Sequence, residues 1–184
     1  MKPTLVIVSG APGSGKTTLA HALAPLIGCP AICRDEIKEG MARSHGADFR
    51  GGHGDDLTQR TLPLFFEVIS TLIAGGVTVV AEAAFQDRVW RPNLEPMLGR
   101  ADLRVVRCAV HASVSFQRAA TRAASNEHRV RAHGDSTLGN DVAAWADLFD
   151  SFEHVSLPVP WIEVDTTSGY DPPLEELIAF IDQD

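Results

Sequence analysis

The chain has 184 residues and a formal net charge of −8, with 45% hydrophobic and 22% charged residues, which are ordinary proportions for a globular protein with a full core. No apolar run approaches a membrane span, and the acidic balance argues against an extended nucleic-acid surface without excluding one. From this length we expect a single domain over residues 1–184. The three cysteines have neither metal-binding nor redox spacing, so we expect a reducing, cytoplasmic setting.

The first apolar stretch, residues 4–9, is rich in β-branched residues and predicts a buried parallel strand rather than a signal peptide. It leads into a glycine-rich loop that fits the phosphate-binding P-loop pattern, with its fixed positions at Gly10, Gly15, Lys16 and Thr17. Apolar residues at helical spacing over 16–26 predict the helix that follows. Strand, loop and helix therefore come in the order that a P-loop requires, which a chance glycine turn would not explain.

A triphosphate is a large anion that needs many donors at close range. Glycines let the backbone wrap a phosphate so that successive N–H groups point inward, and the helix that follows turns its positive end toward the same group. Lys16 can reach the β- and γ-phosphate oxygens, and the Thr17 hydroxyl can bind Mg²⁺. The sequence predicts an ATP site formed by Gly10, Ala11, Pro12, Gly13, Ser14, Gly15, Lys16, Thr17 and Thr18.

Residues 30–33 predict a short second strand, and residues 34–39 open a helix with Asp35 near its N-terminus. The carboxyl ends of parallel strands face the ligand crevice in this kind of sheet. A carboxylate at that place can accept the proton of an acceptor hydroxyl and orient its oxygen. The alternative is that Asp35 only caps the helix, because aspartate is favoured at that position.

Residues 43–56 hold four glycines and little apolar content, which predicts a loop. Apolar spacing over 57–74 then predicts a helix that Gly75 and Gly76 end. Because the loop follows the Asp35 helix, we expect it to help form the acceptor pocket. Its candidates for that role are Arg43, His45, Arg50 and His53.

Residues 77–82 predict the third strand, which ends at Glu82. A P-loop protein usually places an acidic residue there that holds Mg²⁺ through water. The alternative is a strand-end carboxylate in solvent.

A helix near 88–98, a strand over 102–110 and a helix over 113–124 come next. Arg118 and Arg122 share one face of the last helix because they are four positions apart. They lead into a polar segment over 125–140 that carries Arg129 and Arg131. We expect residues 118–140 to form an Arg-rich lid that closes over the nucleotide and supplies positive charge. The alternative is a solvated basic helix.

The remaining pattern predicts a helix over 141–152, a fifth strand over 160–165 and a final helix over 173–181. Asp165 and Thr166 follow the fifth strand, where a contact with the base of the nucleotide is as plausible as a simple turn. Strands that alternate with helices are typical of a parallel α/β sheet. The fold class is therefore a five-stranded parallel sheet flanked by helices, a P-loop NTPase of the nucleoside or adenylate kinase type.

These motifs together resemble the small P-loop kinase group, which includes the polynucleotide 5′-kinase domain, chloramphenicol phosphotransferase and zeta-toxin-like kinases. The resemblance rests on residues 10–17, 34–37, 79–85, the Arg118 and Arg122 helix, and 164–166. It implies that Asp35 is the base and that Arg122 contacts the phosphates. Glu82 departs from the group, which usually has aspartate there.

The leading hypothesis is an ATP- and Mg²⁺-dependent kinase that phosphorylates a hydroxyl of a small molecule. One alternative is a GTPase-like switch, against which the guanine-reading Asn-Lys-x-Asp motif is missing from the sequence. The other alternative is a regulator that binds ATP without catalysis. The sequence does not identify the acceptor, and a nucleic-acid 5′ end is disfavoured only by the acidic balance.

Overall fold

The computed structural model describes residues 2–46, 48–52, 54–134 and 142–183. Five strands pair in parallel into one sheet with the order β2-β3-β1-β4-β5. The strands are β1 (Thr4–Gly10), β2 (Ala31–Cys33), β3 (Val79–Glu82), β4 (Asp102–Ala109) and β5 (Trp161–Asp165). This arrangement confirms the predicted five-stranded parallel sheet.

Eight α-helices and one short 3₁₀-helix are present in the described part of the chain. They are α1 (Lys16–Ile27), α2 (Arg34–Ser44), α3 (Asp56–Ala74), α4 (Asp87–Leu94), η1 (Glu95–Met97), α5 (Ala112–Ser125), α6 (Glu127–His133), α7 (Val142–Asp150) and α8 (Leu174–Ile181). None of these described helices is both long and apolar enough to cross a bilayer. The segment over 125–140, predicted only as polar, contains α6, and the helix predicted near 88–98 divides into α4 and η1.

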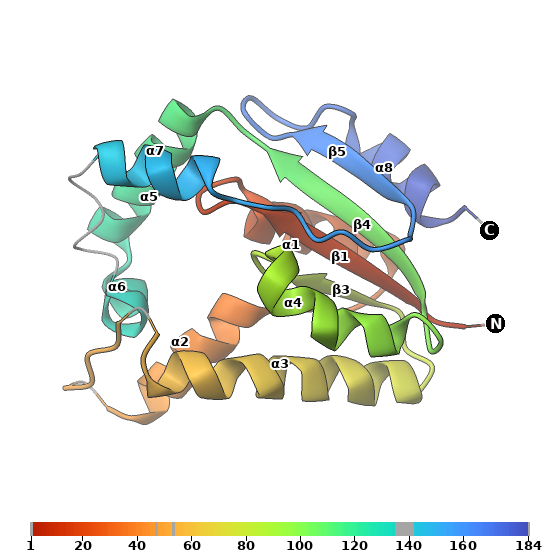
Figure 1. Ribbon diagram of the computed structural model, residues 1–184, viewed down its shortest axis with the longest axis horizontal. Helices are drawn as coiled ribbons and strands as arrows, with labels where there is room; N and C mark the ends of the chain where they lie inside the picture. Colours follow the sequence, from red (N-terminus) through yellow and green to blue (C-terminus); the bar gives the residue numbers. More distant parts are fainter. Residues whose placement is uncertain (1, 47, 53, 135–141, 184) are drawn as a thin grey trace.

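The two faces of the sheet carry separate apolar clusters, because alternate residues of each strand point to opposite faces. On one face, Leu5 and Ile7 of β1 pack with apolar residues of α3 and α4. On the other, Val6 and Val8 pack with α1 and α8. All four β1 side chains are fully buried, which explains why this strand shows no polar alternation. Helices therefore cover both faces of the sheet (Figure 1).

The chain order of the strands reverses at β1, since β3 lies on one side of it and β4 on the other. In open α/β sheets, ligands bind outside the carboxyl ends of the strands at such a reversal. The carboxyl ends of β4 and β5 point toward the side on which α2, α5, α6 and α7 lie (Figure 1). The glycine loop after β1 therefore lies at the same end of the sheet as these helices.

The loop between α2 and α3 is bound to both α2 and α6. Lys38 of α2 is 2% exposed, and its Nζ donates to the Gly52 carbonyl oxygen at 3.0 Å and lies 3.1 Å from Asp55 Oδ1. The Gly51 N–H donates to the Arg131 carbonyl oxygen at 2.7 Å. A Cβ on Gly51 would lie 2.4 Å from the Ala132 carbonyl oxygen, so only glycine lets the loop approach α6 this closely.

Candidate functional site

The glycine loop between β1 and α1 forms a cradle of backbone atoms, and side chains at its glycine positions would fill that space. Gly13 and Gly15 have φ angles of 75° and 78°, in the left-handed region that favours glycine. A Cβ on Gly13 would lie 2.5 Å from the Ser115 carbonyl oxygen, and one on Gly10 would lie 2.4 Å from Ser14 Oγ. These glycines are therefore required by the conformation and by the close packing of the loop.

Lys16, Thr17 and Glu82 converge beneath this cradle. The Thr17 hydroxyl donates to Glu82 Oε2 at 3.0 Å, and Lys16 Nζ lies 3.9 Å from Glu82 Oε1. Lys16 Nζ also donates to the Ala11 carbonyl oxygen at 3.3 Å. Glu82 is 2% exposed. Burial raises the pKa of its carboxyl, an effect that the nearby Lys16 ammonium opposes. Glu82 is thus not a strand-end carboxylate in solvent.

The cradle fits a phosphate chain, and the oxygens below it fit Mg²⁺. The backbone N–H groups of Gly15, Lys16 and Thr17 donate no hydrogen bond to any of the described residues. The buried Ser14 Oγ has no partner there either. Donors with no partner at a helix N-terminus are the group that phosphate binds. The hydroxyl of Thr17 and the carboxylate of Glu82 are oxygen ligands, which Mg²⁺ prefers.

Two contacts from distant elements fix the glycine loop in place. The Ser115 hydroxyl on α5 donates to the Pro12 carbonyl oxygen at 2.6 Å and accepts from Trp145 Nε1 of α7 at 3.2 Å. Beyond β5, the buried Thr166 hydroxyl donates to the Ser14 carbonyl oxygen at 2.7 Å. The loop is therefore held from two sides, and sequence reasoning had no signal for Ser115 or Trp145 in this role.

Asp35 lies in the first turn of α2, whose N-cap residue is Cys33. Its carboxylate lies 3.0 Å from Arg34 Nη1 and 2.9 Å from Arg129 Nη2. Burial raises its pKa, but electrostatic interactions with His133, Arg129, Lys16 and Arg34 outweigh burial and hold the pKa well below its usual range. The alternative that Asp35 only caps α2 is wrong, because Cys33 is the N-cap residue.

Arg129 joins α6 to α2. Its guanidinium donates to Asp35 Oδ2 at 2.9 Å and to Glu39 Oε1 at 2.8 Å. His133, one turn further along α6, lies 3.3 Å from Glu39. The sequence contained the signal: two acids four positions apart on α2 match two basic residues four positions apart on α6, and such pairs share one helix face. Sequence reasoning assigned these basic residues only to a lid.

Arg118 and Arg122 line a hollow of about 530 Å³ beside the glycine loop, together with Thr18, Thr166 and Tyr170. Arg118 Nη2 donates to the carbonyl oxygens of Thr166 and Thr167 at 2.6 and 3.2 Å. Arg118 therefore braces the turn after β5. The hollow has the size of small-ligand pockets.

Asp165 and Thr166, predicted as base contacts, differ in their surroundings. Thr166 lines the hollow and is 4% exposed. The exposed Asp165 carboxylate accepts from the Thr167 N–H at 2.6 Å, which lowers its pKa. Asp165 thus stabilises the turn that carries Thr166.

The predicted lid and loop residues are only partly within the described structure. Residues 118–134 fall on α5 and α6, whereas 135–140 lie outside the described residues, as does His53. Arg43 lines a second pocket between α2 and α6. His45 instead bonds to the Met41 carbonyl oxygen at 2.8 Å, and Arg50 bonds to the Phe49 carbonyl oxygen at 2.9 Å.

Three further potential metal ligands lie beside α1. The donor atoms of His21, Cys33 and Glu36 lie within 4.8 Å of one another. The His21–Glu36 contact of 2.7 Å is itself a hydrogen bond or ion pair. Sulfur and imidazole ligands suit softer metals than Mg²⁺, so the oxygens of Thr17 and Glu82 remain the candidate magnesium ligands.

Comparison with known proteins agrees with this geometry. A sequence profile described as an AAA domain matches residues 5–138. The cytidylate kinase of Pyrobaculum aerophilum is 28% identical over 141 residues, 75% of this chain and 77% of that protein. That of Pyrobaculum neutrophilum is 26% identical over the same shares.

Solved structures share the fold. A candidate kinase from Chloroflexus aurantiacus has a TM-score of 0.79 at 22% identity, with 98% of this chain and 97% of that chain covered. The APS kinase CysC of Mycobacterium tuberculosis, in complex with AMPPNP and APS, has a TM-score of 0.64 at 14% identity, with 99% of both chains covered. A chain of the Pnkp1/Rnl/Hen1 RNA repair complex has a TM-score of 0.59 at 18% identity, with 85% and 48% covered.

The sheet order, the glycine cradle and the Lys16–Thr17–Glu82 cluster define a P-loop nucleotide-binding protein with the kinase-type fold. Its relatives and structural neighbours include phosphotransferases, in agreement with the resemblance to the small P-loop kinases. The profile match covers more than half of the chain, and the chain belongs to the AAA domain family.

Proposed function

We propose that the protein transfers the γ-phosphate of ATP to a hydroxyl group of a small acceptor molecule. The observation that carries this proposal is the place of Asp35. Its carboxylate lies at the carboxyl end of the sheet, where the Lys16 ammonium contributes to lowering its pKa. A phosphate-binding lysine and an ionised carboxylate that act on each other are the two groups that phosphoryl transfer to a hydroxyl needs.

In the proposed reaction, the glycine loop and Lys16 hold the β- and γ-phosphates, and Thr17 and Glu82 hold Mg²⁺. When bound, Mg²⁺ supplies positive charge that offsets the charge of the phosphates. The acceptor oxygen forms a bond to the γ-phosphorus while the bond to the β,γ-bridging oxygen breaks, and ADP leaves. The hydroxyl proton passes to Asp35 and then to solvent.

The low pKa of Asp35 defines what this carboxylate can contribute. A weak base takes up a proton only late, when the acceptor oxygen has already begun to bond to phosphorus. Phosphoryl transfer passes through a loose transition state in most analyses, so orientation matters more than early proton removal. Asp35 therefore orients the hydroxyl and takes up its proton late in the transfer, a step that an amide in its place could not perform.

The arginines of α5 and α6 form the lid of this proposal. Arg122 lines the hollow beside the glycine loop and supplies charge to the transferring phosphoryl group. Arg118 braces the turn that holds Thr166 at the nucleotide. Arg129 orients Asp35.

A second candidate function is phosphorylation of a nucleoside monophosphate, which the similarity to two cytidylate kinases favours. Asp35 argues against it, because a phosphate acceptor is already an anion and needs no base. A carboxylate beside that anion would repel it.

The test is an acceptor screen with γ-labelled ATP and Mg²⁺, run with wild type, Lys16→Ala and Asp35→Asn. A hydroxyl kinase labels an alcohol only when that acceptor is present, and both variants lose the label. Labelling of the phosphate group of a monophosphate, with Asp35→Asn fully active, would establish the second function instead. Hydrolysis of nucleotide without acceptor indicates a switch, and binding without turnover indicates a regulator.

A further inference from the structure

Ser115 contacts the glycine loop from the first turn of α5. Its hydroxyl donates to the Pro12 carbonyl oxygen at 2.6 Å, and the residue is fully buried. A Cβ on Gly13 would lie 2.5 Å from the Ser115 carbonyl oxygen and 2.6 Å from its Oγ. The start of α5 therefore packs directly against the peptide group that joins Pro12 to Gly13.

The orientation of this peptide group decides where the Gly13 N–H points. The Pro12–Gly13 bond is trans, and in a planar trans peptide the carbonyl oxygen and the N–H point in opposite directions. Because the Pro12 carbonyl oxygen faces Ser115, the Gly13 N–H points away from α5. That N–H donates no hydrogen bond to any described residue, so it is available to a phosphate oxygen.

A second hydroxyl orients another peptide group of the loop in the same way. The Thr166 hydroxyl donates to the Ser14 carbonyl oxygen at 2.7 Å. The Gly15 N–H belongs to the same trans peptide, points away from Thr166 and donates to none of the described residues. Hydroxyl groups from two distant elements thus hold loop carbonyl groups outward, which leaves the N–H groups of the same peptides for a ligand.

Trp145 of α7 restricts the direction in which the Ser115 hydroxyl can donate. A serine hydroxyl has one proton to donate and two lone pairs that accept. Trp145 Nε1–H donates to Ser115 Oγ at 3.2 Å, so the hydroxyl proton cannot point toward α7. The buried Trp145 ring packs edge-on against Phe116, with 6.2 Å between the ring centroids. The indole therefore orients the Ser115 hydroxyl toward the glycine loop.

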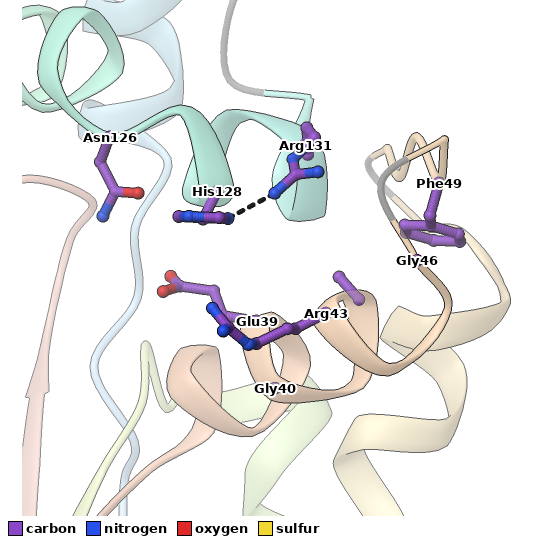
Figure 2. A pocket seen from close by; sticks show the side chains of 9 residues that line it. Glu39, Gly40, Arg43, Gly46, Phe49, Asn126, His128 and Arg131 are labelled. Atoms are coloured by element: carbon purple, nitrogen blue, oxygen red, sulfur yellow. Dashed lines mark hydrogen bonds between the residues drawn. The ribbon is translucent and has the colours of Figure 1, made fainter.

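Helix α5 is itself anchored along its length. Arg118, one turn after Ser115, donates from Nη2 to the Thr166 carbonyl oxygen at 2.6 Å. Asn126 ends α5 and caps α6, since its Oδ1 accepts from the Arg129 N–H at 2.9 Å. Figure 2 shows Asn126 at this junction of the two helices. The fold thus fixes the position from which Ser115 reaches the loop.

We propose that Ser115, oriented by Trp145, is a positioning residue for phosphate binding. Its hydroxyl holds the Pro12 carbonyl oxygen outward and so turns the Gly13 N–H toward the phosphates of the nucleotide. The inference rests on the nucleotide site of the proposed function and not on the identity of the acceptor.

The test observes the Gly13 N–H directly. Pro12–Gly13 is the one Pro-Gly pair in the sequence, so protein made with carbonyl-¹³C proline and ¹⁵N glycine gives a single Gly13 signal in an NMR experiment that selects this pair. We expect the proton of this signal to move downfield when AMPPNP and Mg²⁺ are added to wild type, because the N–H then donates to a phosphate oxygen. In Ser115→Ala most of this shift should be lost.

Calorimetry with AMPPNP and Mg²⁺ measures the same effect as an affinity. Ser115→Ala should raise the Kd by about tenfold, the loss expected for one hydrogen bond to a charged group. Trp145→Phe keeps an aromatic ring and removes the N–H, so its loss should be smaller. Ser125→Ala is the matched control and should bind as wild type, because Ser125 is an exposed serine of α5 whose hydroxyl bonds only to the backbone of α5 among the described residues.

The two measurements separate positioning from support of the fold. Loss of affinity in Ser115→Ala with an unchanged Gly13 shift would show a structural role alone and overturn the inference, as would a wild-type Kd. Absence of any Gly13 shift in wild type on addition of nucleotide would also overturn it. If Ser115→Ala does not fold, Trp145→Phe decides by the same criterion: a reduced shift supports the inference and a wild-type shift rejects it.

The outcome does not depend on phosphoryl transfer. Failure of every hydroxyl acceptor in the labelling screen would reject the proposed function and leave the Gly13 result as it stands. A working acceptor together with an unchanged Gly13 signal in Ser115→Ala would keep the proposed function and reject the role of Ser115.

Discussion

Arg129 Nη2 on α6 lies 2.9 Å from Asp35 Oδ2 on α2, although 94 positions separate the two residues in the chain. The same guanidinium binds Glu39, so one planar group fixes the carboxylate proposed to orient the acceptor. Arginine can do this because its donors form a rigid fork, which lysine lacks. The contact also connects α6, which carries Arg129, to α2, which carries the two carboxylates.

Arg129→Ala should therefore reduce kcat by roughly 10²-fold, the loss typical of misplaced reacting groups. ATP affinity should change less than kcat, because the hydrogen bonds of the Arg129 guanidinium to Asp35 and Glu39 hold α2. Arg129→Lys should recover only part of the loss, since a lysine cannot bridge both carboxylates. Steady-state kinetics and calorimetry of the three proteins measure this. Equal activity of the Ala and Lys variants would contradict an orienting role.

Asp35→Asn should lower kcat by roughly 10²–10⁴, the usual contribution of a positioned general base. Asp35 pairs with Arg34 and Arg129, so the substitution should also lower the melting temperature, and kcat is compared at a temperature where both proteins stay folded. Glu36→Gln is the matched control, an exposed acid in the same helical turn. An Asp35→Asn enzyme with wild-type kcat on a working acceptor would remove Asp35 from the mechanism.

Lys16→Ala should abolish tight ATP binding in calorimetry and leave the circular dichroism spectrum unchanged. Lys16 lies beside Glu82 and opposes the rise in its pKa. The variant should therefore also hold Glu82 protonated to higher pH, which weakens Mg²⁺ binding further. Lys2→Ala, at an exposed lysine before β1, should bind ATP normally. Wild-type affinity in Lys16→Ala would disprove the phosphate-binding assignment.

Arg118→Ala and Arg122→Ala should affect different steps. Loss of Arg118 frees the turn that carries Thr166, so ATP binding should weaken more than turnover. Loss of Arg122 removes charge that matters most as the phosphoryl group transfers, so kcat should fall by roughly 10²-fold or more with a smaller change in ATP affinity. The ratio of kcat to KM effects distinguishes them. An Arg122 effect confined to the KM of ATP would show ground-state binding alone.

Asp55→Asn tests the support of the loop that follows α2. Partial burial raises the pKa of Asp55, but hydrogen bonds from Gly52 and Thr58 and the contact with Lys38 lower it well below its usual range. Such a group stabilises the fold at pH values above its unfolded pKa of about 3.9 and loses this contribution as pH falls toward the folded value.

At neutral pH, Asp55→Asn leaves the Lys38 ammonium, which is 2% exposed, without its anion and should cost about 3–5 kcal/mol. Urea denaturation at pH 7 and near pH 3 measures the difference from wild type, which should shrink in acid. A difference that is the same at both pH values would show that the charge of Asp55 contributes nothing.

The sequence by itself determined the strand order along the chain, the glycine loop and the lysine and threonine that end it. These features are local, since a glycine with a left-handed φ and a helix with free N–H groups are encoded in about ten neighbouring residues. The parallel sheet followed from the same information, because apolar β-branched runs that alternate with helices are typical of that arrangement, whereas the pairing of β1 with β3 and β4 came only from the structure.

Only the tertiary structure decided the roles of residues that meet across the fold. Arg129 could not be separated from six other arginines between Arg100 and Arg131 until α6 was placed over α2. The Ser115–Trp145 support of the glycine loop depends on where α5 and α7 pack, which no local pattern encodes. Asp35 illustrates both levels: its position after the second strand predicted a functional carboxylate, but only the fold showed which charges surround it.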